Sequence, residues 1–239
     1  MINSFLESFS LLLMYFAAAA ALALFARKLL KMPRELFRKT LHLVLLFSLP
    51  VFLYAFTSWT LSVLAALVFA VTVYPVLALG EHFEGYAELL TQRKEGEIKK
   101  SLMLVFLMFA VIISICWGWL GDKKLAEACI YAWGFGDAAA ALVGKRFGRH
   151  FLQGRMIEGR KSLEGTLAMF AVSFLAVFII MILRGGLTLE NCFAISLATS
   201  AVSAVVELFT LGGLDTITCP MAAASVIIPL TVILEGIPL

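Results

Sequence analysis

The sequence predicts an all-α integral membrane protein, a polytopic helix bundle with about eight transmembrane helices. The first observation is composition: 62% of the 239 residues are hydrophobic and only 15% are charged, whereas a soluble domain is about half apolar and a quarter charged. The second is that the apolar residues form runs of about 20, the length that a helix needs to cross a bilayer. The third is that most lysines and arginines fall in three loops between these runs.

Eight apolar runs follow one another along the chain, and each is a candidate membrane span. The first lacks the basic start of a signal peptide, so we expect it to be retained. The second is short, and the fifth and seventh carry acids. No stretch is left for a separate soluble domain, so residues 1–239 are predicted to form one membrane domain. The runs are 4–26, 41–57, 59–79, 101–120, 124–143, 166–183, 191–209 and 217–236.

The distribution of cations predicts the orientation of the spans. The loops 27–40, 80–100 and 144–165 hold six, four and six of the 19 lysines and arginines. Because loops rich in lysine and arginine stay on the cytoplasmic side, these three loops are predicted to be cytoplasmic and both termini to lie outside. The even-numbered spans then begin at the cytoplasmic face, where free backbone N–H groups and the positive end of the helix dipole attract anions.

Three acids are predicted to lie at a similar depth near the cytoplasmic face. Asp137 falls within the fifth run, Glu207 near the end of the seventh, and Asp215 in the turn that follows it. A charged side chain in hydrocarbon costs about 2.5 kcal/mol or more, so it is rarely kept without a partner or a task. A buried ion pair with a loop cation is one explanation. Magnesium is the better one, because it prefers oxygen ligands and nucleotide phosphates can complete its shell.

The loop after Asp137 combines glycines with cations. Its cations are Lys145, Arg146, Arg149, Arg155, Arg160 and Lys161, and its glycines are Gly144, Gly148, Gly154, Gly159 and Gly165. Residues 154–162 nearly spell a P-loop, but an extra arginine breaks the spacing and no strand precedes it. Glycines still allow backbone N–H groups to face an anion, which the cations neutralise. A plain basic loop on anionic lipid head groups is the alternative; the neighbouring Asp137 favours a magnesium nucleotide.

Four blocks of the sequence resemble the family of dolichol kinases, phytol kinases and CTP-dependent diacylglycerol kinases. They are Arg38-Lys39 with His42, Gly136 to Gly144 (GDAAAALVG), Gly159 to Thr166 (GRKSLEGT), and the segment from Glu207 through Asp215 to Pro220. The two middle blocks are the most specific. The last departs from the family pattern, since Leu214-Asp215-Thr216 keeps only the central acid of Asp-Asp-Asn.

The resemblance implies a membrane lipid kinase that uses CTP, or a related nucleotide, with Mg²⁺. Its implied catalytic residues are Asp137, Lys161 and Glu207, and its implied metal ligands are Asp137, Glu207 and Asp215. The implied nucleotide-binding residues are Lys145, Arg146, Gly159, Arg160, Lys161, Ser162 and Gly165. Such catalysis would consist mainly of positioning and charge neutralisation.

Two other functions are compatible with the sequence. A cytidylyltransferase that makes a CDP-lipid from a lipid phosphate would need the same bound Mg-CTP. A transporter could use intramembrane acids as ion ligands, but these acids gather at one face and no inverted repeat is evident. The expected partners are a membrane lipid alcohol and a nucleoside triphosphate, not a nucleic acid. The expected location is the cell membrane in a bacterium, or the endoplasmic reticulum or a plastid membrane in a eukaryote.

Overall fold

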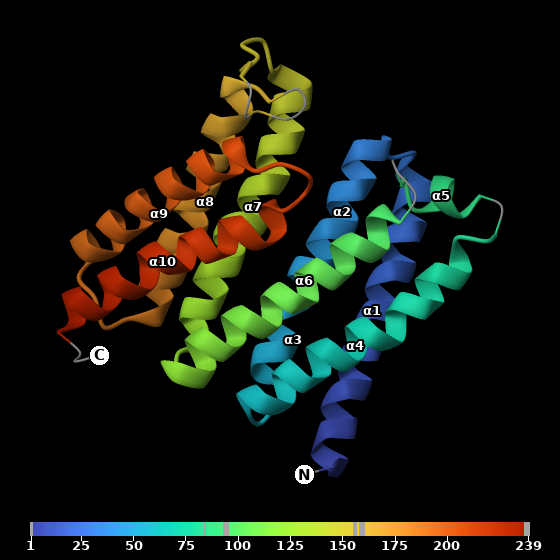
Figure 1. Ribbon diagram of the computed structural model, residues 1–239, viewed down its shortest axis with the longest axis horizontal. Helices are drawn as coiled ribbons and strands as arrows, with labels where there is room; N and C mark the ends of the chain where they lie inside the picture. The colour runs from blue at the N-terminus through green and yellow to red at the C-terminus, as the bar shows by residue number, and fades with distance from the viewer. Residues whose placement is uncertain (1, 84, 93–95, 155–156, 158–160, 237–239) are drawn as a thin grey trace. The chain divides into compact units, whose positions relative to one another are not determined.

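The computed structural model describes residues 2–83, 85–92, 96–154, 157 and 161–236, most of which are helical (Figure 1). In this part of the chain, seven helical segments are long and apolar enough to cross a membrane, which confirms the predicted all-α membrane fold. They are Ile2–Leu30, Arg34–Tyr54, Trp59–Gly80, Glu97–Trp119, Leu163–Arg184, Leu189–Phe209 and Asp215–Glu235. The chain divides into two compact units, Met1–Ser114 (unit 1) and Ile115–Leu239 (unit 2). The single domain expected over 1–239 stays a prediction.

Unit 1 is held together by a phenylalanine core. Its described helices are α1 (Ile2–Leu30), α2 (Arg34–Leu46), α3 (Leu49–Tyr54), α4 (Trp59–Gly80), α5 (Tyr86–Leu89) and α6 (Glu97–Ile113). Helix α4 packs on α6, and α1 packs on α2 and α3. The ring of Phe69 lies 4.5 Å from that of Phe16 and 4.9 Å from that of Phe106, centroid to centroid. Such aromatic pairs add to the stabilisation that burial already supplies.

The second span begins earlier than its apolar run. Helix α2 starts at Arg34, directly after Pro33, whereas the run starts at residue 41. Its first two turns are polar and helical, so hydropathy alone leaves them out. The helix is then interrupted between α2 and α3. Pro50 occupies the first turn of α3, where its missing N–H costs no hydrogen bond.

Unit 2 is a ring of four long helices. They are α7 (Lys123–Phe147), α8 (Leu163–Arg184), α9 (Leu189–Phe209) and α10 (Asp215–Glu235), preceded by a π-helical segment, η1 (Ser114–Trp119). Each helix packs on the next, and α10 packs back on α7 (Figure 1). One end of the bundle therefore gathers the end of α7, the start of α8, the end of α9 and the start of α10. We call it the acid end, because Glu207 and Asp215 lie there.

Helix α7 is the long helix that is not among the seven apolar segments. Its 25 residues would suffice to cross a bilayer, but it carries Glu127, Asp137 and four cations. The contacts with α8 and α10 explain why this is tolerated: much of α7, including Glu127, is buried against protein rather than exposed to lipid.

Glycine lets α7 and α8 approach closely. A Cβ atom on Gly136 would lie 2.3 Å from Ser173 Oγ and 2.9 Å from Met169 Sδ. The same serine donates a 2.6 Å hydrogen bond to the carbonyl of Ala132, one turn earlier on α7. Small residues at a helix interface of this kind are typical of membrane proteins. Gly136, beside Asp137, therefore has a packing role.

Candidate active site

The acid end brings carboxylates from three helices into electrostatic reach of one another. Glu207 lies two residues before the end of α9, and Asp215 is the first residue of α10. Gly212 and Gly213, both with positive φ, allow the tight turn between α9 and α10. The charges of Asp137 and Asp215 both act on Glu207. The structure therefore places two of the acids that the sequence singles out within electrostatic range of the third.

Lys161 forms an ion pair with Glu207. Its Nζ lies 3.0 Å from Glu207 Oε1 and also donates to the backbone carbonyl of Glu207. The two side chains are only 20% and 14% exposed, so the pair is poorly screened by water. The ion pair that the sequence left open as an alternative explanation is thus present for Glu207.

Trp133 connects α7 to Asp215. Its indole Nε1 donates a long hydrogen bond, 3.4 Å, to Asp215 Oδ2. Trp133 and Asp137 are four residues apart on α7, so they share one face of that helix. The face that carries Asp137 is therefore directed toward the start of α10. Sequence analysis missed Trp133, because a tryptophan in an apolar run resembles any other core residue.

Two segments of the loop between α7 and α8 pair with each other just before α8 begins. Phe151 and Ser162 form an antiparallel bridge, in which Leu152 N donates to Lys161 O at 2.9 Å. The carboxylate of Glu164 accepts from the backbone N–H of His150 and lies 2.8 Å from the His150 ring Nδ1. These contacts fix the backbone at Lys161. The anchoring role of Glu164 was not predicted from sequence, although an acid in the first turn of a helix is a usual signal of such contacts.

Ser162 and Gly165 have clear structural roles at the start of α8. The Ser162 hydroxyl caps the helix by accepting from the backbone N–H of Gly165, at 3.2 Å. A Cβ atom on Gly165 would lie 2.9 Å from the carbonyl oxygen of Ala140 on α7. Part of the sequence block around these residues is therefore explained by packing, and their predicted role in nucleotide binding stays a prediction.

The remaining predicted cations lie around the same loop. Lys145 and Arg146 are exposed in the last turn of α7, and the Arg146 guanidinium lies over the Phe147 ring at 5.5 Å. Gly159 and Arg160 lie outside the described residues. Exposed cations at a helix C-terminus are stabilised by the helix dipole.

The donor chemistry suits magnesium, although the acids do not form a tight ligand cluster. Among the described residues, no three of the His, Cys, Asp or Glu side chains are grouped closely enough to hold a metal ion. Magnesium is usually held by one or two carboxylates, several waters and substrate phosphates rather than by a complete protein cage. The oxygen ligands of Asp137, Glu207 and Asp215 fit that pattern, and their metal role stays a prediction.

The block Arg38-Lys39 with His42 belongs to unit 1. Arg38 pairs with Glu35 at 2.6 Å, one turn earlier on α2, and with Glu97 at the start of α6 at 3.4 Å. Lys39 is buried, and His42 is partly buried. The contacts of Arg38 tie α2 to α6 and account for this residue structurally.

One curated protein is similar to this chain at a level that supports the predicted kinship. It is named phytol kinase, from Synechocystis sp., and is 36% identical over 105 residues. The match covers 44% of this chain and 44% of the relative, so the chain spans less than half the length of the relative that it matches. No family model and no solved structure matches. The match confirms the resemblance to phytol kinases that the sequence blocks indicate.

Proposed function

We propose that this protein is a membrane lipid kinase that transfers the terminal phosphate of CTP, or a related nucleotide, to a long-chain lipid alcohol. The observation that carries the proposal is the convergence of three carboxylates with Lys161 beside a cationic loop. The similarity to a phytol kinase supports the same reaction. A bilayer delivers the lipid alcohol sideways, and the aqueous side supplies the nucleotide, so a site at the end of a membrane bundle suits both substrates.

At the acid end, the acidic residues and the basic residues have different roles in this proposal. Asp137, Glu207 and Asp215 would hold magnesium, which supplies positive charge against the phosphate oxygens when bound. Lys145, Arg146 and Lys161 bind the triphosphate, joined by Arg160 from outside the described residues. In phosphoryl transfer, positioning and charge neutralisation carry most of the catalysis. The lipid hydroxyl attacks the terminal phosphorus, its proton passes to a base, and the nucleoside diphosphate leaves.

Lys161 has a second task in this proposal. Without nucleotide it pairs with Glu207, a carboxylate that is mostly shielded from water. Bound phosphate oxygens would offer the Lys161 ammonium another anionic partner, and bound magnesium would offer the Glu207 carboxylate another cationic one. The exchange leaves neither charge without a partner.

The direct test is an assay of the purified full chain with CTP and Mg²⁺ against a panel of lipid alcohols and lipid phosphates. We expect a lipid monophosphate to form from at least one of phytol, polyprenol, dolichol or diacylglycerol. ATP and GTP in place of CTP test the choice of nucleotide. Turnover of a lipid phosphate to a CDP-lipid, with no phosphorylation of any alcohol, would identify a cytidylyltransferase instead.

We also propose that the acid end faces the cytoplasm, on the basis of the three cation-rich loops. All four native cysteines are buried, so a cysteine introduced at the exposed Gly154 is the natural target for an impermeant thiol reagent. We expect labelling of Gly154→Cys only after the membrane is opened or inverted. Labelling from the outside of intact cells would place the nucleotide site on the wrong side of the membrane.

A further inference from the structure

A groove in unit 1, separate from the residues assigned to the acid end, runs along one face of α6. Its volume is about 390 Å³, and it is lined by Tyr74 on α4 and by Gly96, Lys99, Lys100, Met103 and Leu104 at the start of α6. The five positions from α6 are spaced at i, i+3, i+4, i+7 and i+8, so they form a single stripe on that helix. The lining comes from two neighbouring helices, because α4 packs on α6.

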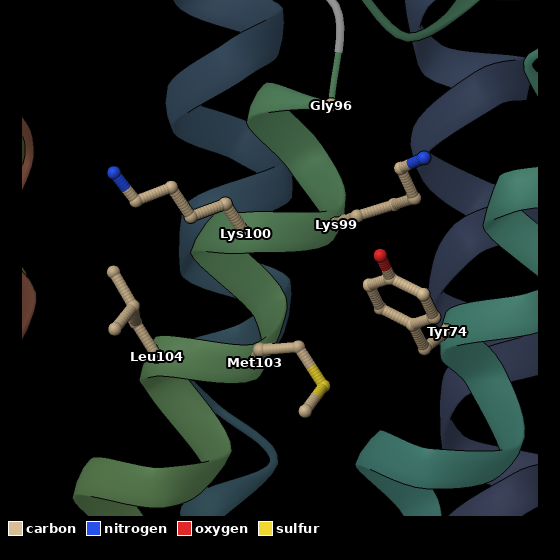
Figure 2. Close-up of a pocket in the computed structure, with 6 residues that line it drawn as sticks. All are labelled: Tyr74, Gly96, Lys99, Lys100, Met103 and Leu104. Carbon is tan, nitrogen blue, oxygen red and sulfur yellow. The ribbon is translucent and has the colours of Figure 1, made fainter.

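The groove changes from cationic to apolar along its length. The two lysines lie in the first turn of a membrane-spanning segment, Glu97–Trp119, and Met103 and Leu104 lie about one turn deeper. Figure 2 shows the two lysines on opposite sides of the stripe, with the Met103 side chain directed toward Tyr74. Positive charge at the membrane boundary followed by an apolar floor is complementary to a lipid with an anionic head group.

The walls of the cationic part are fixed by contacts with neighbouring elements. Lys99 Nζ lies 2.5 Å from Glu81 Oε2 and 5.6 Å from the centre of the Tyr74 ring. The hydrogen bond from Lys99 lowers the pKa of Glu81, which follows the end of α4. The ion pair with Glu81 therefore fixes the position of the Lys99 side chain and partly neutralises its charge. Lys100, across the stripe, is exposed and can turn to a ligand.

The acids beside the groove are already engaged by neighbouring groups. Glu81 pairs with Lys99 and accepts from the backbone N–H of Gly96, and Glu97 pairs with Arg38. Their negative charges are thus offset locally, and the exposed Lys100 is the cation that an anionic head group can meet.

We propose that this groove binds an anionic phospholipid of the surrounding membrane, with its phosphate at Lys100 and one chain along Met103 and Leu104. This lipid site is independent of the reaction assigned to unit 2. Such a bound lipid would join α4 to the start of α6 and stabilise unit 1 by an amount that rises with the logarithm of its affinity.

The test is a binding titration of the purified full chain in detergent with phosphatidylglycerol, and with phosphatidylcholine and inorganic phosphate as separate arms. We expect Lys100→Gln to weaken phosphatidylglycerol binding about fivefold, the effect of one lysine near an anionic lipid surface. Lys28→Gln, an exposed lysine in the last turn of α1, is the matched control and should leave the affinity unchanged. Neither substitution affects a buried residue, so both variants should fold.

A second pair of variants tests the apolar half. Leu104→Ser, in the groove floor, should weaken binding of the lipid, whereas Leu107→Ser, an exposed position on the same helix, should not. Equal losses for Lys28→Gln and Lys100→Gln would mean general charge attraction and would overturn the proposal. So would equal affinity for phosphatidylcholine, or displacement of the lipid by inorganic phosphate at the concentration of the lipid itself, which would indicate a site for the free anion.

Discussion

The two ends of unit 2 both bring carboxylates and a cation together from separate helices, but they do so in different ways. At the end opposite the acid end, Arg184 of α8 lies 2.5 Å from Asp122 Oδ2 through Nε and meets both carboxylate oxygens of Glu235, with Nη2 2.9 Å from Oε2. It also donates to the carbonyl of Gly185. At the acid end, one ammonium, Lys161, pairs with one of three interacting carboxylates.

Within one bundle, the contacts of the cation distinguish an ion network that holds the helices together from one that can exchange a partner for a ligand. A guanidinium fork that is engaged at all three nitrogens fixes geometry and leaves little room for a ligand. A lysine is a point charge on a flexible stem, and its partner can be exchanged for a phosphate. Substitutions at the Arg184 end should therefore reduce stability, and substitutions at the acid end should reduce activity.

The largest expected effect on activity comes from Asp137→Asn. An amide is nearly isosteric with a carboxylate but is a poor magnesium ligand, so we expect activity to fall by about 100-fold or more, beyond the usual effect of residues that only support a metal ligand. The midpoint of thermal unfolding should stay near that of the parent. The measurements are kinase activity and thermal denaturation of the same preparation. A folded Asn variant with full activity would remove Asp137 from the site.

The largest expected effect on stability comes from Arg184→Ala. Removing the cation leaves Asp122 and Glu235, both mostly shielded from water, without their shared partner. Loss of one member of a buried pair costs about 3–5 kcal/mol of unfolding free energy. Denaturant unfolding in detergent measures the loss, and activity per folded molecule should be preserved. A stable but inactive Arg184→Ala variant would mean that the Arg184 end serves activity rather than stability.

Lys161→Gln should affect both properties, each to a smaller degree. Lys161 pairs with one carboxylate, whereas Arg184 bridges two, so the stability cost should be below that of Arg184→Ala, about 1–2 kcal/mol. The KM for the nucleotide should rise, because one phosphate contact is lost. Lys124→Gln is a matched control, because Lys124 pairs with Glu127 at 2.7 Å on α7 but lies near its other end. Equal effects of both variants on KM would argue against phosphate binding by Lys161.

The smallest expected effect concerns an ion pair outside unit 2. Lys99 lowers the pKa of Glu81 below its ordinary value of 4.5, so ionised Glu81 stabilises the fold at neutral pH. That contribution is lost as the pH falls below 4.5, through the lowered pKa. We expect Glu81→Gln to unfold at a slightly lower temperature than the parent at pH 7, with the gap closing toward pH 3. A difference in unfolding temperature that widens as the pH falls would contradict a stabilising role for ionised Glu81.

Much of the fold could be predicted because apolar runs of about 20 residues have few alternatives to a membrane helix. The ends of the helices could not, since the polar first turns of α2 and the last turn of α7 are helical yet outside the hydrophobic runs. The convergence of Asp137, Glu207 and Asp215 was predicted from their similar depth. The contacts of Trp133 with Asp215 and of Glu164 with His150 depend on helix pairing, which a single sequence does not specify.

The measurement that tests the central claim most directly uses CTP labelled at two different phosphates. With a long-chain alcohol and magnesium, label on the terminal phosphate should enter the lipid fraction, and label on the innermost phosphate should remain in soluble CDP. Asp137→Asn protein provides the background for both labels. Innermost label in the lipid, with release of pyrophosphate when a lipid phosphate is the acceptor, would contradict the kinase and indicate a cytidylyltransferase.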